Sequence, residues 1–185
     1  VRRGQPLLFG IGTDDAHYYD GKPQPMCIPG NAWCSVRANS PCAEDILPAM
    51  CQGDFFACEG LEAEDVSFDQ KRGMLSVSVA AAPTLRRKIS FIVSKRDFRE
   101  RPIRTDTITL KKGEEVLRRK VSSYAGVGVT VKEVVGEPGE PVLASYVMAE
   151  DDLYVRARIE SPEPPLCRIS LHPKNVCCWT QPYVA

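Results

Sequence analysis

Apolar and polar residues alternate through most of the second half of the chain, at the period of two that is typical of half-buried β-strands. The clearest case covers residues 153–159, where Leu153, Val155, Ala157 and Ile159 alternate with polar or charged residues. Further strands are predicted at residues 75–79, 89–93, 105–110, 114–121, 127–131, 142–148 and 176–180. Turn-forming residues separate them at the spacing of an antiparallel sandwich, so the sequence predicts a β-sandwich in this part of the chain.

The first 60 residues show a different pattern. Residues 7–12 form a continuous apolar run, which predicts a strand buried on both faces, as in a parallel sheet. Residues 20–31 hold three prolines and two glycines and are expected to form a loop. Residues 32–38 are predicted to be a short apolar strand. The change of pattern places a boundary between two regions near residues 60–65.

A helix is predicted over residues 41–52. Ser40 and Pro41 suit its first positions, and Gly53 suits its carboxyl end. Pro48 disturbs this pattern, because a proline inside a helix removes one backbone hydrogen bond. We therefore expect the helix to begin nearer Glu44 or to kink.

Composition and charge restrict the function classes. The chain has 185 residues, of which 18 are valine and 12 leucine, which favours sheet and excludes a disordered chain. Lys+Arg and Asp+Glu both total 24, so there is no net charge to attract nucleic acid or an anionic membrane. No apolar run is long enough to span a bilayer, and we expect a cytoplasmic protein. The start at Val1, just before an apolar strand, suggests a fragment.

A local basic stretch covers residues 86–104, with eight basic and two acidic residues. Such a stretch can bind nucleic acid or phosphate. It lacks a clear series of interleaved aromatic residues, so we do not expect nucleic-acid binding; contact with another part of the protein or with a partner is the favoured alternative.

The eight cysteines leave three alternatives open. They are Cys27, Cys34, Cys42, Cys51, Cys58, Cys167, Cys177 and Cys178. None forms the Cys-x-x-Cys pair of a zinc ribbon, which argues against metal binding. Reduced, mostly buried thiols are the favoured interpretation, and disulfides in an exported protein are the second.

Candidate metal ligands follow the first apolar run. In extended backbone, residues two apart point the same way, so Asp15 and His17 can reach one cation, while Asp14 faces away. The alternative is that an aspartate caps a turn and His17 is an ordinary loop residue. Tyr18 and Tyr19 follow directly and, with Asp14, are candidates for a substrate pocket. The other histidine, at position 172, precedes a proline and is expected in an exposed loop.

The string from Gly12 to His17, Gly-Thr-Asp-Asp-Ala-His, resembles the last metal-ligand motif of the PHP (polymerase and histidinol phosphatase) family of phosphoesterases. Five later segments are similar to the same family and come in the same order. They are Trp-Cys-Ser-Val-Arg-Ala at 33–38, Ala-Glu-Asp-Ile-Leu-Pro-Ala-Met at 43–50, Gln-Gly-Asp-Phe-Phe-Ala-Cys-Glu-Gly at 52–60, and a final strand and tail at 152–159 and 178–182.

The resemblance implies a mixed α/β and β fold. Residues 1–62 would be the last strand-helix unit of a distorted PHP-type (β/α) barrel, and residues 63–185 an appended antiparallel β-sandwich. It also implies Asp15 and His17 as ligands of manganese, iron or zinc, and hydrolysis of a phosphorylated small molecule by metal-bound hydroxide. The family's earlier ligands would precede Val1, so we expect this chain to be inactive without the amino-terminal part of the barrel. The resemblance leaves both alternatives open for the chain alone, a weakly bound metal or none.

Two other classes remain as alternatives. One is a non-catalytic β-sandwich module that binds a partner or a carbohydrate. The other is a secreted domain stabilised by disulfides. The sequence defines neither the substrate nor the metal, because specificity depends on loops that surround the whole site.

Overall fold

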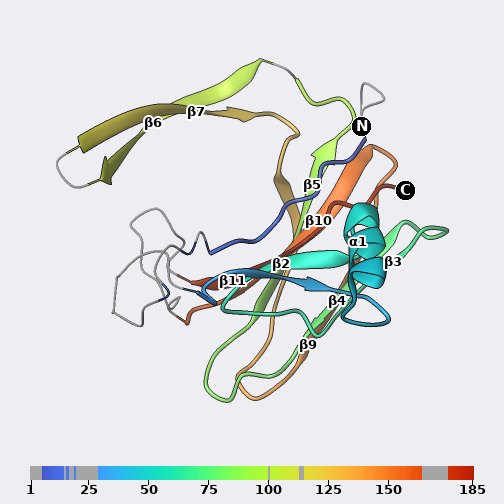
Figure 1. The fold of residues 1–185 in the computed structure, drawn as a ribbon. Helices are drawn as coiled ribbons and strands as arrows, with labels where there is room; N and C mark the ends of the chain where they lie inside the picture. Colours follow the sequence, from blue (N-terminus) through green and yellow to red (C-terminus); the bar gives the residue numbers. More distant parts are fainter. Residues whose placement is uncertain are drawn as a thin grey trace.

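The computed structural model describes residues 6–14, 16, 19, 29–99, 101–112, 115–163 and 175–185. Its elements are β1 (Trp33–Val36), α1 (Ala43–Gln52), β2 (Phe55–Glu59), β3 (Asp65–Asp69), β4 (Met74–Val79), β5 (Lys88–Lys95), β6 (Pro102–Lys112), β7 (Glu115–Tyr124), β8 (Val129–Val135), β9 (Val142–Val147), β10 (Asp152–Ser161) and β11 (Val176–Thr180). Figure 1 shows two sheets packed together and a long hairpin that projects from them.

The larger sheet has six strands in the order β1-β2-β11-β10-β5-β8, and every pair of neighbours is antiparallel. The alternation predicted for residues 153–159 is confirmed in β10, whose residues are buried and half-buried in turn. Val155, Ala157 and Ile159 are fully buried, while Arg156 and Arg158 lie on the opposite face of the strand. The alternation along β10 therefore defines a core-facing side and an outer side of the sheet.

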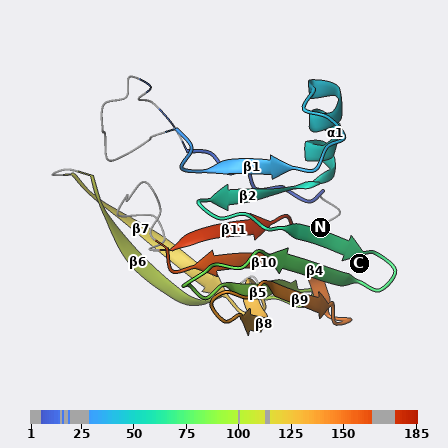
Figure 2. The same cartoon turned by 90° about the horizontal axis from the view of Figure 1, so that it is seen from below.

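The smaller sheet, in the order β3-β4-β9, covers the inner side of the larger one and gives a sandwich-like arrangement (Figure 2). One buried cluster contains residues of both sheets, including Val77 of β4, Ala144 of β9, Phe91 of β5 and Cys178 of β11. The β-sandwich predicted from the alternating pattern is thus present in its general form. Among the described residues, no helix has the length and apolar character needed to cross a membrane.

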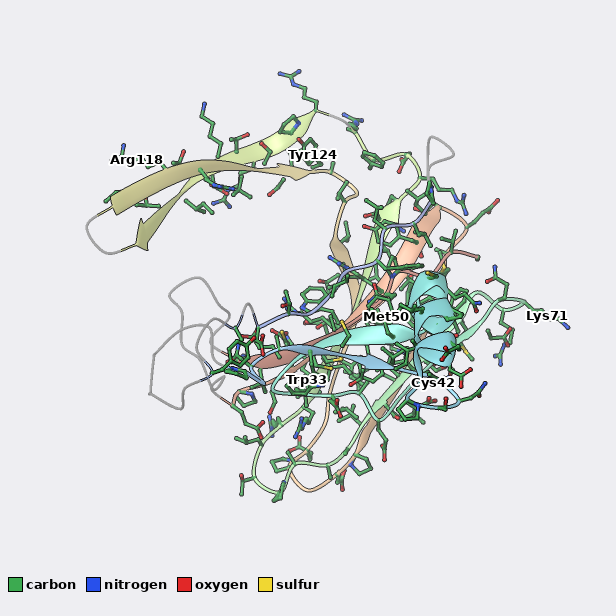
Figure 3. All side chains as sticks on the ribbon, viewed as in Figure 1. Trp33, Cys42, Met50, Lys71, Arg118 and Tyr124 are labelled. Carbon is green, nitrogen blue, oxygen red and sulfur yellow. The ribbon has the colours of Figure 1, made fainter. Side chains whose placement is uncertain are left out.

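Strands β6 and β7 pair with each other as a separate two-stranded sheet. The hairpin extends away from the sandwich, and Arg118 and Tyr124 mark its outer and inner portions in Figure 3. Ile108 and Val121 lie on it with more than two fifths of their surface exposed. The hairpin therefore adds little to the buried core.

The helix predicted over residues 41–52 is confirmed, with a start close to Glu44. It begins after Cys42 and ends at Gly53, which adopts the left-handed conformation with φ 82°. The backbone N–H of Gly53 donates to the carbonyl oxygen of Met50. Pro48 lies inside the helix, where it cannot donate to the carbonyl of Glu44 four residues earlier.

The predicted fold class is wrong in one major respect: the described residues contain no remnant of a β/α barrel. β1 and β2, which were assigned to the last strand-helix unit, are antiparallel to each other, and β2 pairs with β11 in the large sheet. The error arose because the apolar pattern of a short strand does not specify which other strand pairs with it. β2 reaches β11 across about 120 intervening residues, as the pairing of Cys58 with Cys178 shows.

The strand expected at residues 7–12 is also absent. This segment has no regular secondary structure, and none of its residues is fully buried: Leu8 is 87% exposed and Ile11 67% exposed. Phe9 packs edge-on against Phe55, with ring centroids 6.2 Å apart. A continuous apolar run therefore did not indicate burial on both faces here.

The strand expected at residues 127–131 begins later, at Val129, and lies at one end of the large sheet. Val129 and Val131 remain more than one third exposed, whereas Val134 packs against the core. The pairing with β5 shifts between Phe91 and Ile92, so the alternation of the first valines does not continue in register.

Candidate functional site

Three of the predicted site residues, Asp15, His17 and Tyr18, lie outside the described residues, as does His172. Asp14 and Tyr19 are described. The Asp14 carboxylate accepts hydrogen bonds from the backbone N–H groups of Ala16 and Gly30, at 3.2 and 2.7 Å. One carboxylate thus joins the start of the loop to the residues just before β1.

Tyr19 is largely exposed, and its hydroxyl donates to the carbonyl oxygen of Ala16 at 3.1 Å. It therefore contacts the backbone within the segment that carries the predicted ligands. This contact positions the Tyr19 ring beside the backbone of Ala16.

The segment before this loop is attached to the large sheet by two side chains. Gln181 accepts from the N–H of Gly10 at 2.8 Å and donates to its carbonyl at 2.9 Å, as a neighbouring strand would. The Cys34 sulfur lies 3.3 Å from the Gly12 nitrogen and 3.6 Å from its oxygen. The base of the loop is therefore fixed against β1 and the end of β11.

Between this segment and the outer side of the large sheet lies a groove made of two adjoining cavities. The first has a volume of about 600 Å³ and is lined by Leu7, Ile11, Arg156 and Trp179, among others. The second, of about 410 Å³, shares Ile11 and Trp179 and extends to Glu160. Cavities of this size suit small-molecule ligands. We call the two cavities together the outer groove.

Trp179 is the aromatic centre of the outer groove. The guanidinium carbon of Arg156 lies 4.6 Å from its ring centroid, and that of Arg158 lies 5.2 Å away. Arg158 also forms an ion pair with Glu160 at 2.9 Å. The Arg156 Nε atom is buried and has no hydrogen-bond partner. Arg156 therefore brings a positive charge to the groove.

A charged network continues from Glu160 along the same face. The Lys88 ammonium nitrogen lies 3.1 Å from a carboxylate oxygen of Glu160 and 3.2 Å from one of Glu133. The Ser90 hydroxyl donates to the Glu133 carboxylate at 2.8 Å. The hydrogen bond with Glu160 is the main reason that the pKa of Lys88 is raised. The hydrogen bond from Ser90, followed by that from Lys88, lowers the pKa of Glu133. These charges neutralise one another at the end of the groove.

Much of the basic stretch at residues 86–104 is paired in this way. In addition to the ion pairs of Lys88, the Arg86 guanidinium lies 2.9 Å from the Glu137 carboxylate, and the Lys95 ammonium lies 2.8 Å from the Asp152 carboxylate. These contacts give the stretch a structural role in holding strands together. They leave less free positive charge than the sequence suggests.

Three cysteines lie on the paired strands β2 and β11, two on one face of the sheet and one on the other. Cys58 and Cys178 are direct cross-strand partners on the core side, and their sulfur atoms lie 3.7 Å apart and share a hydrogen bond. Cys177 lies on the other side of the sheet, near Glu59, and burial raises the pKa of its thiol. None of the three takes part in a disulfide. The expectation of reduced, buried thiols thus describes these three residues.

No group of three or more histidine, cysteine, aspartate or glutamate residues in the described part of the chain could hold a metal ion. Asp15 and His17 would supply a carboxylate and an imidazole, which suit manganese, iron or zinc. Two donors do not complete a catalytic centre, so these residues fit such a metal only as part of a larger ligand set.

The sequence interpretation missed the outer groove. Its residues come from the amino-terminal segment, β2, β10 and β11, and their proximity depends on long-range pairing. One signal was available: Arg156 and Arg158 lie two residues apart in a clearly alternating strand, so both had to face away from the core. The place of Trp179 beside them required the register of β10 and β11.

Comparisons of this chain with family models, with curated proteins and with solved structures find no match.

Proposed function

We propose that this chain contributes Asp15 and His17 as two ligands of a metal-dependent phosphoesterase centre whose other ligands lie outside these 185 residues. The proposal combines the resemblance of the motif from Gly12 to His17 with one structural observation. Asp14, directly before the two ligands, binds the backbone at Ala16 and Gly30 and so holds the loop closed at its base.

Neighbouring residues have different roles in this arrangement. Asp14 accepts two backbone N–H groups and acts as the capping residue of this turn, while the motif assigns Asp15 and His17 to the metal. The loop base is attached to the large sheet through Gly12 and Cys34. A fixed base reduces the conformational freedom that two ligands lose when they bind one ion.

Asp15 and His17 would hold the metal of a complete centre, and that metal would supply a hydroxide nucleophile and neutralise charge on the phosphoryl oxygens. The part of this chain is to hold and orient that metal through one carboxylate and one imidazole. The chain alone is expected to bind metal weakly and to hydrolyse no phosphate ester, since most of the ligand set is missing.

Metal binding by the full chain can be tested with Mn²⁺, whose preference for oxygen and imidazole ligands limits interference from the eight cysteines. Electron paramagnetic resonance measures free hexaaquo Mn²⁺ during a titration. We expect the wild-type chain to remove more Mn²⁺ from solution than the double variant D15N/H17A.

The matched control is His172→Ala, which removes the other histidine and should leave Mn²⁺ binding unchanged. Equal Mn²⁺ binding by the wild type and the double variant would overturn the proposal. So would a loss of binding in His172→Ala as large as that in the double variant.

The second candidate is a non-catalytic binding module, and the outer groove favours it. The Arg156 guanidinium lies over the Trp179 ring and brings a positive charge to the groove, which suits a small anionic ligand. Inorganic phosphate can serve as the probe, with tryptophan emission as the signal. This candidate predicts saturable quenching that is lost in Arg156→Gln and kept in Arg86→Gln, an exposed arginine elsewhere on the molecule. Absence of saturation in the wild type would exclude it for phosphate.

A further inference from the structure

We propose that Cys58 and Cys178 are a redox pair that peroxide converts to a disulfide between β2 and β11. The inference starts from position. The two residues are direct partners in an antiparallel ladder, where opposite Cα atoms lie about 4.5 or 5.5 Å apart. Both spacings fall within the range that disulfides require.

The sulfur atoms already face each other. They lie 3.7 Å apart on the core side of the sheet, and both residues are almost completely buried. A disulfide has an S–S distance of about 2.05 Å, so a further approach of roughly 1.7 Å completes the bond. Rotation of the two side chains can supply part of this approach, and the strands need not change partners.

The two thiols have unequal environments, as the two steps of disulfide formation require. The hydrogen bond shared with Cys178 lowers the pKa of the Cys58 thiol, whereas the same hydrogen bond and burial raise the pKa of Cys178. Cys58 is thus the more acidic of the two thiols, and the thiolate is the nucleophile. Cys178 remains a protonated thiol until the second step, in which its sulfur attacks Cys58.

The chemistry balances with one peroxide molecule. The Cys58 thiolate attacks a peroxide oxygen; an S–O bond forms, the O–O bond breaks, and the leaving hydroxide takes a proton to become water. The sulfur of Cys178 then attacks the resulting Cys58 sulfenic acid; an S–S bond forms, the S–O bond breaks, and a second water leaves with the thiol proton. Two thiols are oxidised, and one peroxide is reduced to two waters.

Two polar side chains lie on the β1 side of the pair. The Ser35 hydroxyl is 4.0 Å from the Cys58 sulfur and donates to Glu62, an exposed carboxylate. Polar groups thus connect the Cys58 side of the pair to the surface. Hydrogen peroxide is small and uncharged, so it reaches a buried thiol more readily than a bulky disulfide reagent does.

The bond would fix an entire edge of the molecule. Within the described residues, β1 and α1 are connected to the remainder of the large sheet through the pairing of β2 with β11. A disulfide between residues 58 and 178 would make this connection covalent. The loop base at Gly12 and Gly30 adjoins the same edge, through β1. Oxidation would therefore stabilise the edge that carries the predicted metal ligands.

The test is peptide mapping by mass spectrometry after limited hydrogen peroxide treatment of the folded chain and alkylation of the remaining thiols. We expect a linked pair of peptides that contains Cys58 and Cys178, slower amide hydrogen exchange in β2, and loss of both effects in Cys58→Ala and in Cys178→Ala. The linkage should disappear on reduction.

Cys177→Ser is the matched control, because Cys177 is also buried and adjacent in sequence but lies on the opposite face of β11. It should still form the 58–178 linkage. Cys42 and Cys51 are exposed, and their oxidation shows that the peroxide was effective. Oxidation of these two with Cys58 and Cys178 still free, or a linkage that forms only after denaturation, would overturn the inference.

Discussion

Gly53 shows how one residue connects the helix to the amino-terminal segment. It has φ 82°, and a Cβ added there would lie 2.6 Å from Cε1 of Phe9. A side chain at this position therefore meets two penalties, the left-handed backbone and a contact with an aromatic ring. Because Phe9 packs on Phe55, the ring has restricted freedom to move away.

We expect Gly53→Ala to lower the free energy of unfolding by about 2–3 kcal/mol, as the sum of backbone strain and overpacking. Gly139→Ala is the matched control, since Gly139 has φ 84° and no atom within 4 Å of the added Cβ. It should cost only the backbone part, about 1 kcal/mol. Equal losses for both variants in chemical denaturation would show that the contact with Phe9 contributes nothing.

Asp152 is the most completely buried carboxylate among the described residues. Its carboxylate lies 2.8 Å from the Lys95 ammonium and accepts hydrogen bonds from the Tyr146 hydroxyl and the Ala149 N–H. Burial raises its pKa, but the hydrogen bonds from Lys95, Tyr146 and Ala149 together lower the pKa below the ordinary value of 3.8. The group therefore favours its charged form in the folded protein.

This shift fixes the direction of a pH effect. A carboxyl group whose pKa is lower in the folded state stabilises the protein above its unfolded pKa, and the contribution is lost as the pH falls through the folded pKa. We expect Asp152→Asn to cost about 3 kcal/mol at pH 7 and to reduce the loss of stability below about pH 4. The measurement is denaturant unfolding across a series of pH values.

Asp151→Asn provides the comparison, because its carboxylate contacts the same Lys95 but is 60% exposed. An exposed ion pair contributes at most about 1 kcal/mol. If the two variants behaved alike at every pH, the special role of the buried carboxylate would be refuted.

At the scale of elements, the sandwich strands and the β6–β7 hairpin contribute very differently to stability. Ile159 of β10 is fully buried in the cluster between the sheets, whereas Ile108 of β6 is 41% exposed. Ile159→Ala should cost about 3 kcal/mol through lost burial and a cavity. Ile108→Ala should change the free energy of unfolding by about 0.5 kcal/mol or less. A large loss in Ile108→Ala would mean that the hairpin packs against the sandwich in solution.

Local patterns predicted the elements that depend on local physics. The alternation in β10 and β4 gave both the strands and their core-facing residues, and Gly53 marked the end of α1. The candidate site was less predictable. The role of Asp14 depends on its contact with Gly30, sixteen residues away, and turn capping was only one of the alternatives considered.

Pairing between distant strands could not be deduced from those patterns. β1 and β2 have the apolar character of strands, but nothing in five residues indicates that β2 pairs with β11 rather than with a parallel neighbour. The outer groove depends on the same pairing, because Trp179 is in β11 and Ala57 in β2. The barrel interpretation and the missed groove therefore have one common cause.

For the whole molecule, the main consequence of this pairing is that one sheet extends from β1 to β8. The sheet brings together strands from the first 60 residues and strands from the sandwich region. The segment of residues 6–14 is attached to it through Gln181 and Cys34. The predicted ligands Asp15 and His17 thus follow a segment that the sandwich itself holds in place.

The most direct test is a residue-resolved map of Mn²⁺ binding by nuclear magnetic resonance, because a bound paramagnetic ion broadens the signals of nearby amides. The proposal predicts that substoichiometric Mn²⁺ first broadens amides around residues 13–19 and 29–31, and that the D15N/H17A variant loses this effect. Broadening centred instead on the acidic residues Glu133 and Glu160, unchanged in the variant, would contradict a metal site at Asp15 and His17.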